Sequence, residues 1–163
     1  MTRRIYLVLL VFSLTAVTAW AEPKDEYTRL ARLSYIEGNV SYQHSADDDW
    51  SAASVNLPLE PGDRIYTGHD GRAEIEFEDG SLYRLGRNTD IEILSLREER
   101  IQLRILVGLS TLIVGSDTDV EINTPAAAFT ALRKGTYRFG VNENGDSDAS
   151  VRKGELEAAN NYF

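Results

Sequence analysis

The chain has 163 residues, of which 42% are hydrophobic, and its 17 basic and 26 acidic residues give a formal net charge of −9. This length fits one domain, and the acidic balance disfavours a nucleic-acid partner because the chain would repel phosphate groups. The absence of cysteine excludes disulfides, thiolate metal sites and a cysteine nucleophile.

The first predicted element is an N-terminal targeting segment. Arg3 and Arg4 precede an apolar run over residues 5–21, which ends in the small-residue pattern Ala-Trp-Ala. This order predicts a secretory signal peptide over residues 1–21, cut after Ala21, and hence a periplasmic or secreted protein. An uncleaved membrane anchor is the alternative, but the 17 residues of the run are at the lower limit for a spanning helix. We expect membrane contact only through this segment before cleavage.

Cleavage would remove 21 of the 163 residues, including two arginines and no acid, leaving 142 residues with a net charge of −11. We expect residues 22–30 to form a short linker, residues 31–158 a single domain, and residues 159–163 a tail. Without cysteines, an exported domain must be stabilised by its core alone.

Polar and apolar residues alternate with period two in most of the predicted domain, which indicates half-buried strands. The clearest stretches are residues 31–36, 40–43, 72–78, 101–107 and 137–141. Residues 100–114 are long enough for a helix, but Gly108 and many β-branched residues favour a strand. Turn signals separate the strands, at Pro61-Gly62-Asp63, Asp70-Gly71, Asp79-Gly80, Lys134-Gly135, Asn144-Gly145-Asp146 and Lys153-Gly154. The sequence predicts an all-β domain of many short strands, built as a sandwich, a roll or a short β-solenoid.

The turn and core residues follow an ordered pattern. It contains Gly38-Asn39-Val40, Trp50, Leu59-Glu60-Pro61-Gly62-Asp63-Arg64-Ile65-Tyr66-Thr67-Gly68, the stretch Gly71 to Ser81, and Asn88-Thr89. This arrangement resembles the FecR-like domain family. The later part is similar as well, through Gly108, Thr124-Pro125, Gly135-Thr136-Tyr137 and Val151 to Gly154, so that the resemblance covers residues 31–158.

The resemblance implies an all-β extracytoplasmic domain. In regulatory members of that family, such a domain relays a signal from an outer-membrane receptor to a cytoplasmic segment that binds a sigma factor. Here only four residues precede the apolar run, so we do not expect a direct anti-sigma role. The resemblance carries over no ligand and no catalytic residue.

The motif residues are predicted to be structural. Glycines permit turns, and turn aspartates bond nearby backbone amides, while threonines suit strand ends. The residues with these expected roles are Gly62, Asp63, Thr67, Gly71, Asp79, Gly80, Asn88, Thr89 and Gly135. Trp50 is expected to be a core or packing residue rather than a sugar platform, and it is the one speculative binding residue.

Three acidic segments were weighed as chemical sites. Glu74, Glu76 and Glu78 share one strand face, and a solvated acidic stripe is favoured over paired catalytic carboxylates. His44 with three aspartates at 47–49 is favoured as an acidic loop over a cation site, and residues 142–148 as a hairpin turn over a calcium loop. No nucleophile or phosphate-loop motif occurs, and neither His44 nor His69 has a predicted role. We expect neither catalysis nor a metal or cofactor.

The sequence therefore predicts an exported, non-enzymatic FecR-like domain that binds another envelope protein or serves as a scaffold, with a possible link to signalling. A carbohydrate or cell-wall binding module that uses Trp50 is the alternative hypothesis. A small hydrolase with outward carboxylates is a weaker one.

Overall fold

The computed structural model describes residues 29–160, so the predicted signal peptide, most of the linker and the last three residues lie outside the described range. Within it, all regular structure is β, which confirms the all-β class. The strands are β1 (Ala31–Glu37), β2 (Val40–Gln43), β3 (Ser51–Ala52), β4 (Pro58–Leu59), β5 (Arg64–Thr67), β6 (Arg72–Phe77), β7 (Leu82–Leu85), β8 (Thr89–Leu96), β9 (Arg100–Val114), β10 (Asp119–Asn123), β11 (Ala127–Ala131), β12 (Gly135–Val141), β13 (Ser147–Lys153) and β14 (Leu156–Asn160). Residues 29–160 contain no helix long and apolar enough to cross a membrane.

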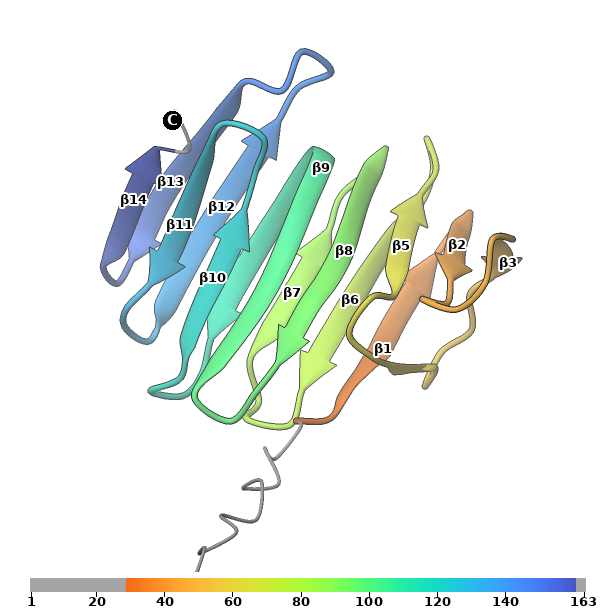
Figure 1. Ribbon diagram of the computed structural model, residues 1–163, viewed down its shortest axis with the longest axis horizontal. Coiled ribbons are helices and arrows are strands. Elements are labelled where there is room, and N and C mark those ends of the chain that lie inside the picture. Colours follow the sequence, from red (N-terminus) through yellow and green to blue (C-terminus); the bar gives the residue numbers. More distant parts are fainter. Residues whose placement is uncertain (1–28, 161–163) are drawn as a thin grey trace, which may run out of the picture.

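The strands form one curled sheet whose two halves face each other as layers (Figure 1). One layer has the order β3-β2-β5-β8, continues through the first half of β9, and ends with β10, β11 and β14. The other has the order β4-β1-β6-β7, continues through the second half of β9, and ends with β12 and β13. Strand β9 runs parallel to β10, and the other pairs between described strands are antiparallel.

Strand β9 belongs to both layers. Its 15 residues are all strand, as the sequence predicted. Its first half pairs with β8 and β10, and from Gly108 onward it pairs with β12 and then β7. Gly108 has a φ of +107°, and a Cβ there would lie 2.5 Å from the Cα of Thr89. The bend therefore requires glycine, both for its backbone conformation and for the close approach of β8.

The core lies between the layers. Most of the alternating residues predicted from the sequence point inward, and the largest fully buried side chains are Tyr83, Tyr137, Phe77 and Phe139. Tyr35 is an exception, because the register of β1 shifts between Leu33 and Tyr35 and leaves this side chain 49% exposed. The hydroxyls of both buried tyrosines are satisfied: that of Tyr83 donates to Ser110 Oγ at 2.8 Å, and that of Tyr137 donates to the Arg133 carbonyl at 2.6 Å. Burial of this apolar surface is the main stabilising contribution to a fold without disulfides.

Strands β13 and β14 and the turn between them, residues 147–160, form what we call the terminal arch. The arch passes from one layer to the other at Gly154, whose φ is +108°. Its side chains are largely exposed, unlike those of β12 and β11 beside it. The predicted turn glycine Gly135 lies instead in β12, where a Cβ would come within 2.1 Å of the Lys153 carbonyl oxygen. At this position glycine allows β12 and β13 to approach closely.

Candidate binding surface

An aromatic cluster lies on the outer face of the layer that contains β2, β3 and β5. Trp50 is 41% exposed and Tyr66 is 38% exposed. Trp50 is therefore not a core residue, and of the two structural roles expected for it, the packing role remains. Residue 50 directly precedes β3, a two-residue strand at the edge of the sheet. From there the Trp50 ring packs on the outer surface of the sheet, against Arg64 and Tyr66.

The strand register brings Trp50 to this face. In β5, Ile65 and Thr67 are buried, so the alternating residues Arg64 and Tyr66 point outward. Strand β2 pairs with β5, with Gln43 opposite Arg64, and β3 pairs with β2 on its other side. Trp50 then lies across β2 from Arg64, although the two are 14 positions apart in the sequence.

Arg64 holds this cluster together. Its Cζ lies 5.3 Å from the centre of the Trp50 ring, a cation–π arrangement, and the Trp50 and Tyr66 rings are 6.4 Å apart at 76°. Arg64 Nη2 also donates to Asp90 Oδ2 on β8 at 2.6 Å. Burial raises the pKa of Asp90 above its usual value, although the hydrogen bond and charge of Arg64 act in the opposite direction. We call Trp50, Arg64, Tyr66 and Asp90 the tryptophan surface.

A buried carboxylate anchors the loop that leads to Trp50. Asp63 is fully buried and accepts hydrogen bonds from the backbone amides of Ser45 at 3.1 Å and Glu60 at 2.8 Å. It also accepts one from the Tyr42 hydroxyl at 3.1 Å, and its Oδ1 lies 2.8 Å from His44 Nδ1. Burial, together with the negative charge of Asp63, raises the pKa of Tyr42 to about 12. Asp63 therefore ties the segment after β2 to the turn before β5, which makes the network a structural support for the tryptophan surface.

The two motif threonines form a second buried hydrogen-bond network, at the end of β5 and the start of β8. Thr67 and Thr89 are opposite each other in the β5–β8 pair and are both fully buried. Thr67 Oγ1 accepts from the Thr89 amide at 3.0 Å, and Thr89 Oγ1 accepts from the Leu109 amide at 3.1 Å. Asn88 precedes this network with a φ of +49°. The threonine hydroxyls thus connect β5, β8 and the bend of β9.

The remaining motif residues shape turns. Gly62 and Gly80 have φ values of +94° and +78°, whereas a Cβ at Gly71 would lie 2.2 Å from the Asn39 carbonyl oxygen. Asp79 Oδ1 accepts from the Ser81 amide at 2.9 Å, and its Oδ2 accepts from Ser116 Oγ and faces Arg29. Burial acts to raise the pKa of Asp79, but these hydrogen bonds and the arginine outweigh it and lower the pKa.

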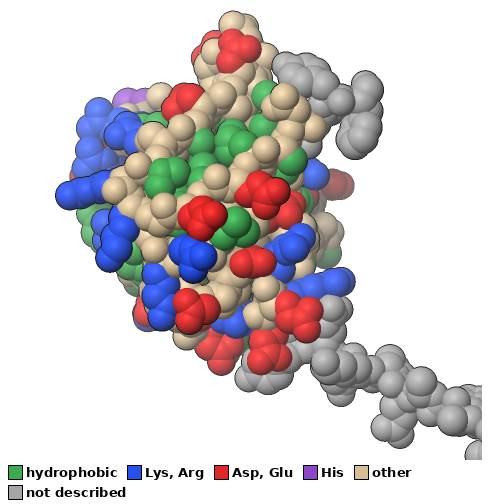
Figure 2. All heavy atoms as spheres, turned by 90° about the vertical axis from the view of Figure 1, so that its left-hand side faces the viewer, with side chains coloured by type: hydrophobic (Ala, Val, Ile, Leu, Met, Phe, Trp, Pro, Cys, Tyr) green, Lys and Arg blue, Asp and Glu red, His purple; other side chains and the backbone are tan. Residues whose placement is uncertain are grey.

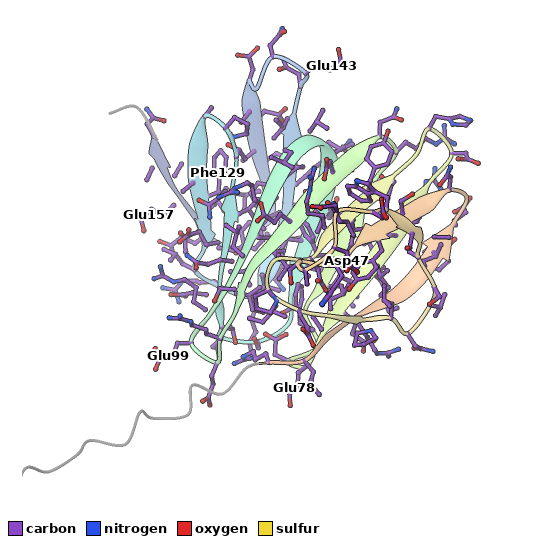
Figure 3. The ribbon with its side chains drawn as sticks, turned by 45° about the vertical axis from the view of Figure 1, so that its right-hand side comes forward. Asp47, Glu78, Glu99, Phe129, Glu143 and Glu157 are labelled. Atoms are coloured by element: carbon purple, nitrogen blue, oxygen red, sulfur yellow. The ribbon has the colours of Figure 1, made fainter. Side chains whose placement is uncertain are left out.

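The three acidic segments, at residues 74–78, 47–49 and 142–148, lie in separate parts of the structure. Strand β6 lies inside its layer, and Glu74 and Glu76 form ion pairs with Arg84 at 2.7 Å and Arg32 at 2.5 Å. They are therefore members of a cross-strand charge pattern rather than a bare acidic stripe. Asp47 and Glu143 lie on different loops (Figure 3). Between residues 29 and 160, no three acidic or histidine side chains are grouped to hold a metal ion.

The hairpin weighed against a calcium loop has a structural explanation, and His69 lies on the surface. In the hairpin between β12 and β13, the Asn142 side chain accepts from the amides of Asn144 and Asp146, both at 2.9 Å, and so organises the turn itself. His69 is 89% exposed and lies 3.8 Å from the Asp70 carboxylate.

Comparison with protein families matches residues 63–157 to the FecR protein family. The chain belongs to this family. The FecR match begins at Asp63, immediately before β5, and ends within β14. Strands β1 to β4 precede the match but belong to the same sheet: β1 pairs with β6 and β2 with β5, while β4 and β3 extend them at the edges. Neither the curated proteins nor the solved structures gave a match. Membership of the FecR family indicates a signalling-related envelope module.

Sequence analysis missed three members of the tryptophan surface. Arg64 and Tyr66 are two residues apart, which was a sufficient signal that they share one face of a strand. Their contact with Trp50 depends on the β2–β3 register, which a two-residue strand does not reveal. Asp90 lies on the third strand of the same face, across another pairing.

Proposed function

We propose that this FecR-family chain is an exported, non-enzymatic module of the cell envelope that binds another protein through the tryptophan surface. The observation that carries the proposal is the association of an exposed tryptophan, an exposed tyrosine and an arginine on one sheet face. These three residue types dominate the energetic centres of protein interfaces.

The rigidity of this cluster supports the proposal. Arg64 is held by Asp90 on one side and packs on Trp50, while the loop before Trp50 is tied to buried Asp63. A side chain that is already ordered loses less conformational entropy when a partner binds. The expected partner presents apolar groups to the Trp50 and Tyr66 rings and acceptors toward Arg64.

Export is a separate part of the proposal. It rests on the order of basic residues, apolar run and small residues in the first 21 positions. N-terminal sequencing of the protein recovered from a cell fractionation experiment should give Glu22 as the first residue, in the periplasmic or secreted fraction. An intact N-terminus in the membrane fraction would contradict cleavage.

A carbohydrate ligand is the second candidate, because Trp50 and Tyr66 are exposed aromatic rings. Sugars stack on a flat, open aromatic face, whereas here Arg64 lies over the Trp50 ring and Tyr66 meets it edge-on. This arrangement favours a protein partner over a glycan.

A comparison of two aromatic variants tests the binding surface. Trp50→Ala should reduce the recovery of a specific protein, crosslinked and captured from an envelope extract, by about tenfold or more. Tyr35→Ala is the matched control, because Tyr35 is 49% exposed on β1 in the other layer, and it should leave recovery unchanged. Equal recovery with both variants contradicts the proposed surface. Binding to isolated peptidoglycan that is lost in Trp50→Ala would instead support the carbohydrate alternative.

A further inference from the structure

The two ends of the sandwich differ in how their edges are protected. At one end the edge strands β3 and β4 have two residues each, and β4 begins with Pro58, which has no N–H to offer a new strand. At the other end the edges are β13 and β14, with seven and five residues. Among the described strands, β13 pairs with β12 alone and β14 with β11 alone, so each leaves one side free.

The inner faces of these long edges are apolar. Val151 and Ala149 lie opposite the buried residues Tyr137 and Phe139 of β12, so they point toward the space between the layers. Leu156 and Ala158 of β14 point the same way, opposite the buried residues of β11. Val151 is nevertheless 44% exposed. Figure 2 shows hydrophobic side chains gathered across the middle of this end of the molecule, with charged side chains around them.

We propose that a second copy of this chain docks end to end on the terminal arch, with β13 of each copy beside β14 of the other. Strands β13 and β14 run in opposite directions (Figure 1). A twofold axis between the layers and parallel to the strands therefore places β13 antiparallel to β14 of the second copy in both layers at once. Such an interface is isologous and closed, so it ends at a dimer.

The residues of the two edges match in this register. If inward side chains meet inward side chains, Val151 lies opposite Leu156 of the second copy and Ala149 opposite Ala158. Arg152 then lies opposite Glu155, with Glu157 as its diagonal neighbour on the outer face. Pairing β14 with its own copy would instead bring two Glu157 side chains opposite or diagonal to each other, which is repulsive. Charge complementarity thus favours β13 with β14 over like with like.

We expect the affinity of the two copies for each other to be modest, because the contact is small and both copies are acidic. Closing both layers pairs the free edges of β13 and β14 and covers the apolar inner face of the arch, but the contact is confined to strands of seven and five residues. The net charge of −9 on each chain opposes association, and salt reduces this long-range repulsion. We therefore expect a dimer that forms at micromolar concentration rather than an obligate one.

Sedimentation velocity on protein recovered after expression of the complete chain tests the dimer. The sedimentation coefficient should rise from the monomer to the dimer value between roughly 1 and 200 µM. Arg152→Glu and Glu155→Arg should each weaken association by about tenfold, and the double variant should restore it. Trp50→Ala should associate like the wild type, so failure of this inference and failure of the proposed function are distinguishable. A wild-type monomer at the highest concentration overturns the inference.

Because the chain has no cysteine, single cysteines can report which strands meet. A mixture of the Val151→Cys and Leu156→Cys variants should form a disulfide-linked dimer on oxidation, since directly opposite residues have Cβ atoms close enough to bridge. Each variant oxidised alone should give much less linked dimer. Efficient linkage of Val151→Cys to itself would show like-with-like pairing and contradict the proposed arrangement.

Discussion

The region around the bend of β9 and the terminal arch are both made of antiparallel strands, yet they are held in different ways. Around the bend, side-chain hydroxyls bond to the backbone of neighbouring strands, as those of Thr67 and Thr89 do. In β13, Val151 points inward but is 44% exposed, and each strand of the arch has a neighbour on one side. The comparison shows that antiparallel strands with alternating residues can form either a buried interior or an exposed sheet edge, according to whether another strand or layer covers them.

The motif residues of the family lie at the bend and at the turns that begin β5 and β7 rather than in the terminal arch. Asp63 and Asp79 act as acceptors for backbone amides, and the motif glycines allow close approaches that a side chain would block. We infer that the shared pattern specifies the fold of this region. Trp50 lies outside the matched residues, whereas its partners Arg64, Tyr66 and Asp90 lie within them.

The largest expected loss of stability comes from adding a side chain at Gly108, where β9 bends against β8. Gly108→Ala should lower the free energy of unfolding by about 3 kcal/mol or more, because the new Cβ would meet backbone atoms of β8 while the φ of +107° is already unfavourable. Urea denaturation measures this loss. Gly80→Ala is the control: its φ is +78° but no atom lies within 4 Å of the new Cβ, so about 1 kcal/mol is expected. Equal losses would show that space at the bend does not matter.

A smaller loss of stability, which depends on pH, is expected when Asp79 is replaced. Because its pKa is lowered in the folded state, its carboxylate stabilises the fold above the ordinary pKa of 3.8, and this contribution is lost as the pH falls through the folded-state value. Asp79→Asn should therefore cost about 1–2 kcal/mol at pH 7, and the difference from wild type should shrink below pH 3.8.

Denaturation curves between pH 7 and pH 2 test this dependence. Asp117→Asn is the matched control, because the Asp117 side chain is 89% exposed and its ion pair with Lys134 spans 3.6 Å. The control should change stability by less than about 0.5 kcal/mol at any pH. A difference for Asp79→Asn that stays constant with pH would contradict the role of its charge.

The smallest expected effect is in the terminal arch. Val151→Ala should cost less than about 1 kcal/mol in the monomer, whereas Val120→Ala in β10 should cost about 2 kcal/mol, because Val120 is fully buried. Denaturation at low protein concentration compares the two without dimer formation. Equal costs would mean that the arch is packed as firmly as the core.

The alternation of residues was sufficient to predict much of the fold. The strands around residues 31–36, 72–78 and 101–107 follow from period two, and the choice of strand over helix for residues 100–114 followed from its β-branched residues and Gly108. The layer arrangement was not predictable, because it depends on β9 changing partners at Gly108. The buried positions of β9 are odd-numbered before the bend and even-numbered after it, and this change of phase does not say which strands pair on each side.

The candidate site was less predictable than the fold. Trp50 was expected to be either a core or a packing residue, since a large aromatic residue between polar loops carries no signal of its direction, and the structure places it on the surface. Its contact with Arg64 depends on pairing across β2, which is a tertiary feature.

The role of Gly135 was also not predictable. The Lys-Gly pair is a turn signal and predicts a turn at this residue, whereas the close approach of Lys153 across the β12–β13 pair determines its role.

The shared strand β9 has a mechanical consequence. A force applied to the outer face of one layer, for example by a partner on the tryptophan surface, passes to the other layer through continuous covalent backbone as well as through side-chain contacts. The layers cannot slide apart without stretching or unpairing that strand. A pull on one layer therefore loads the other through the backbone of β9.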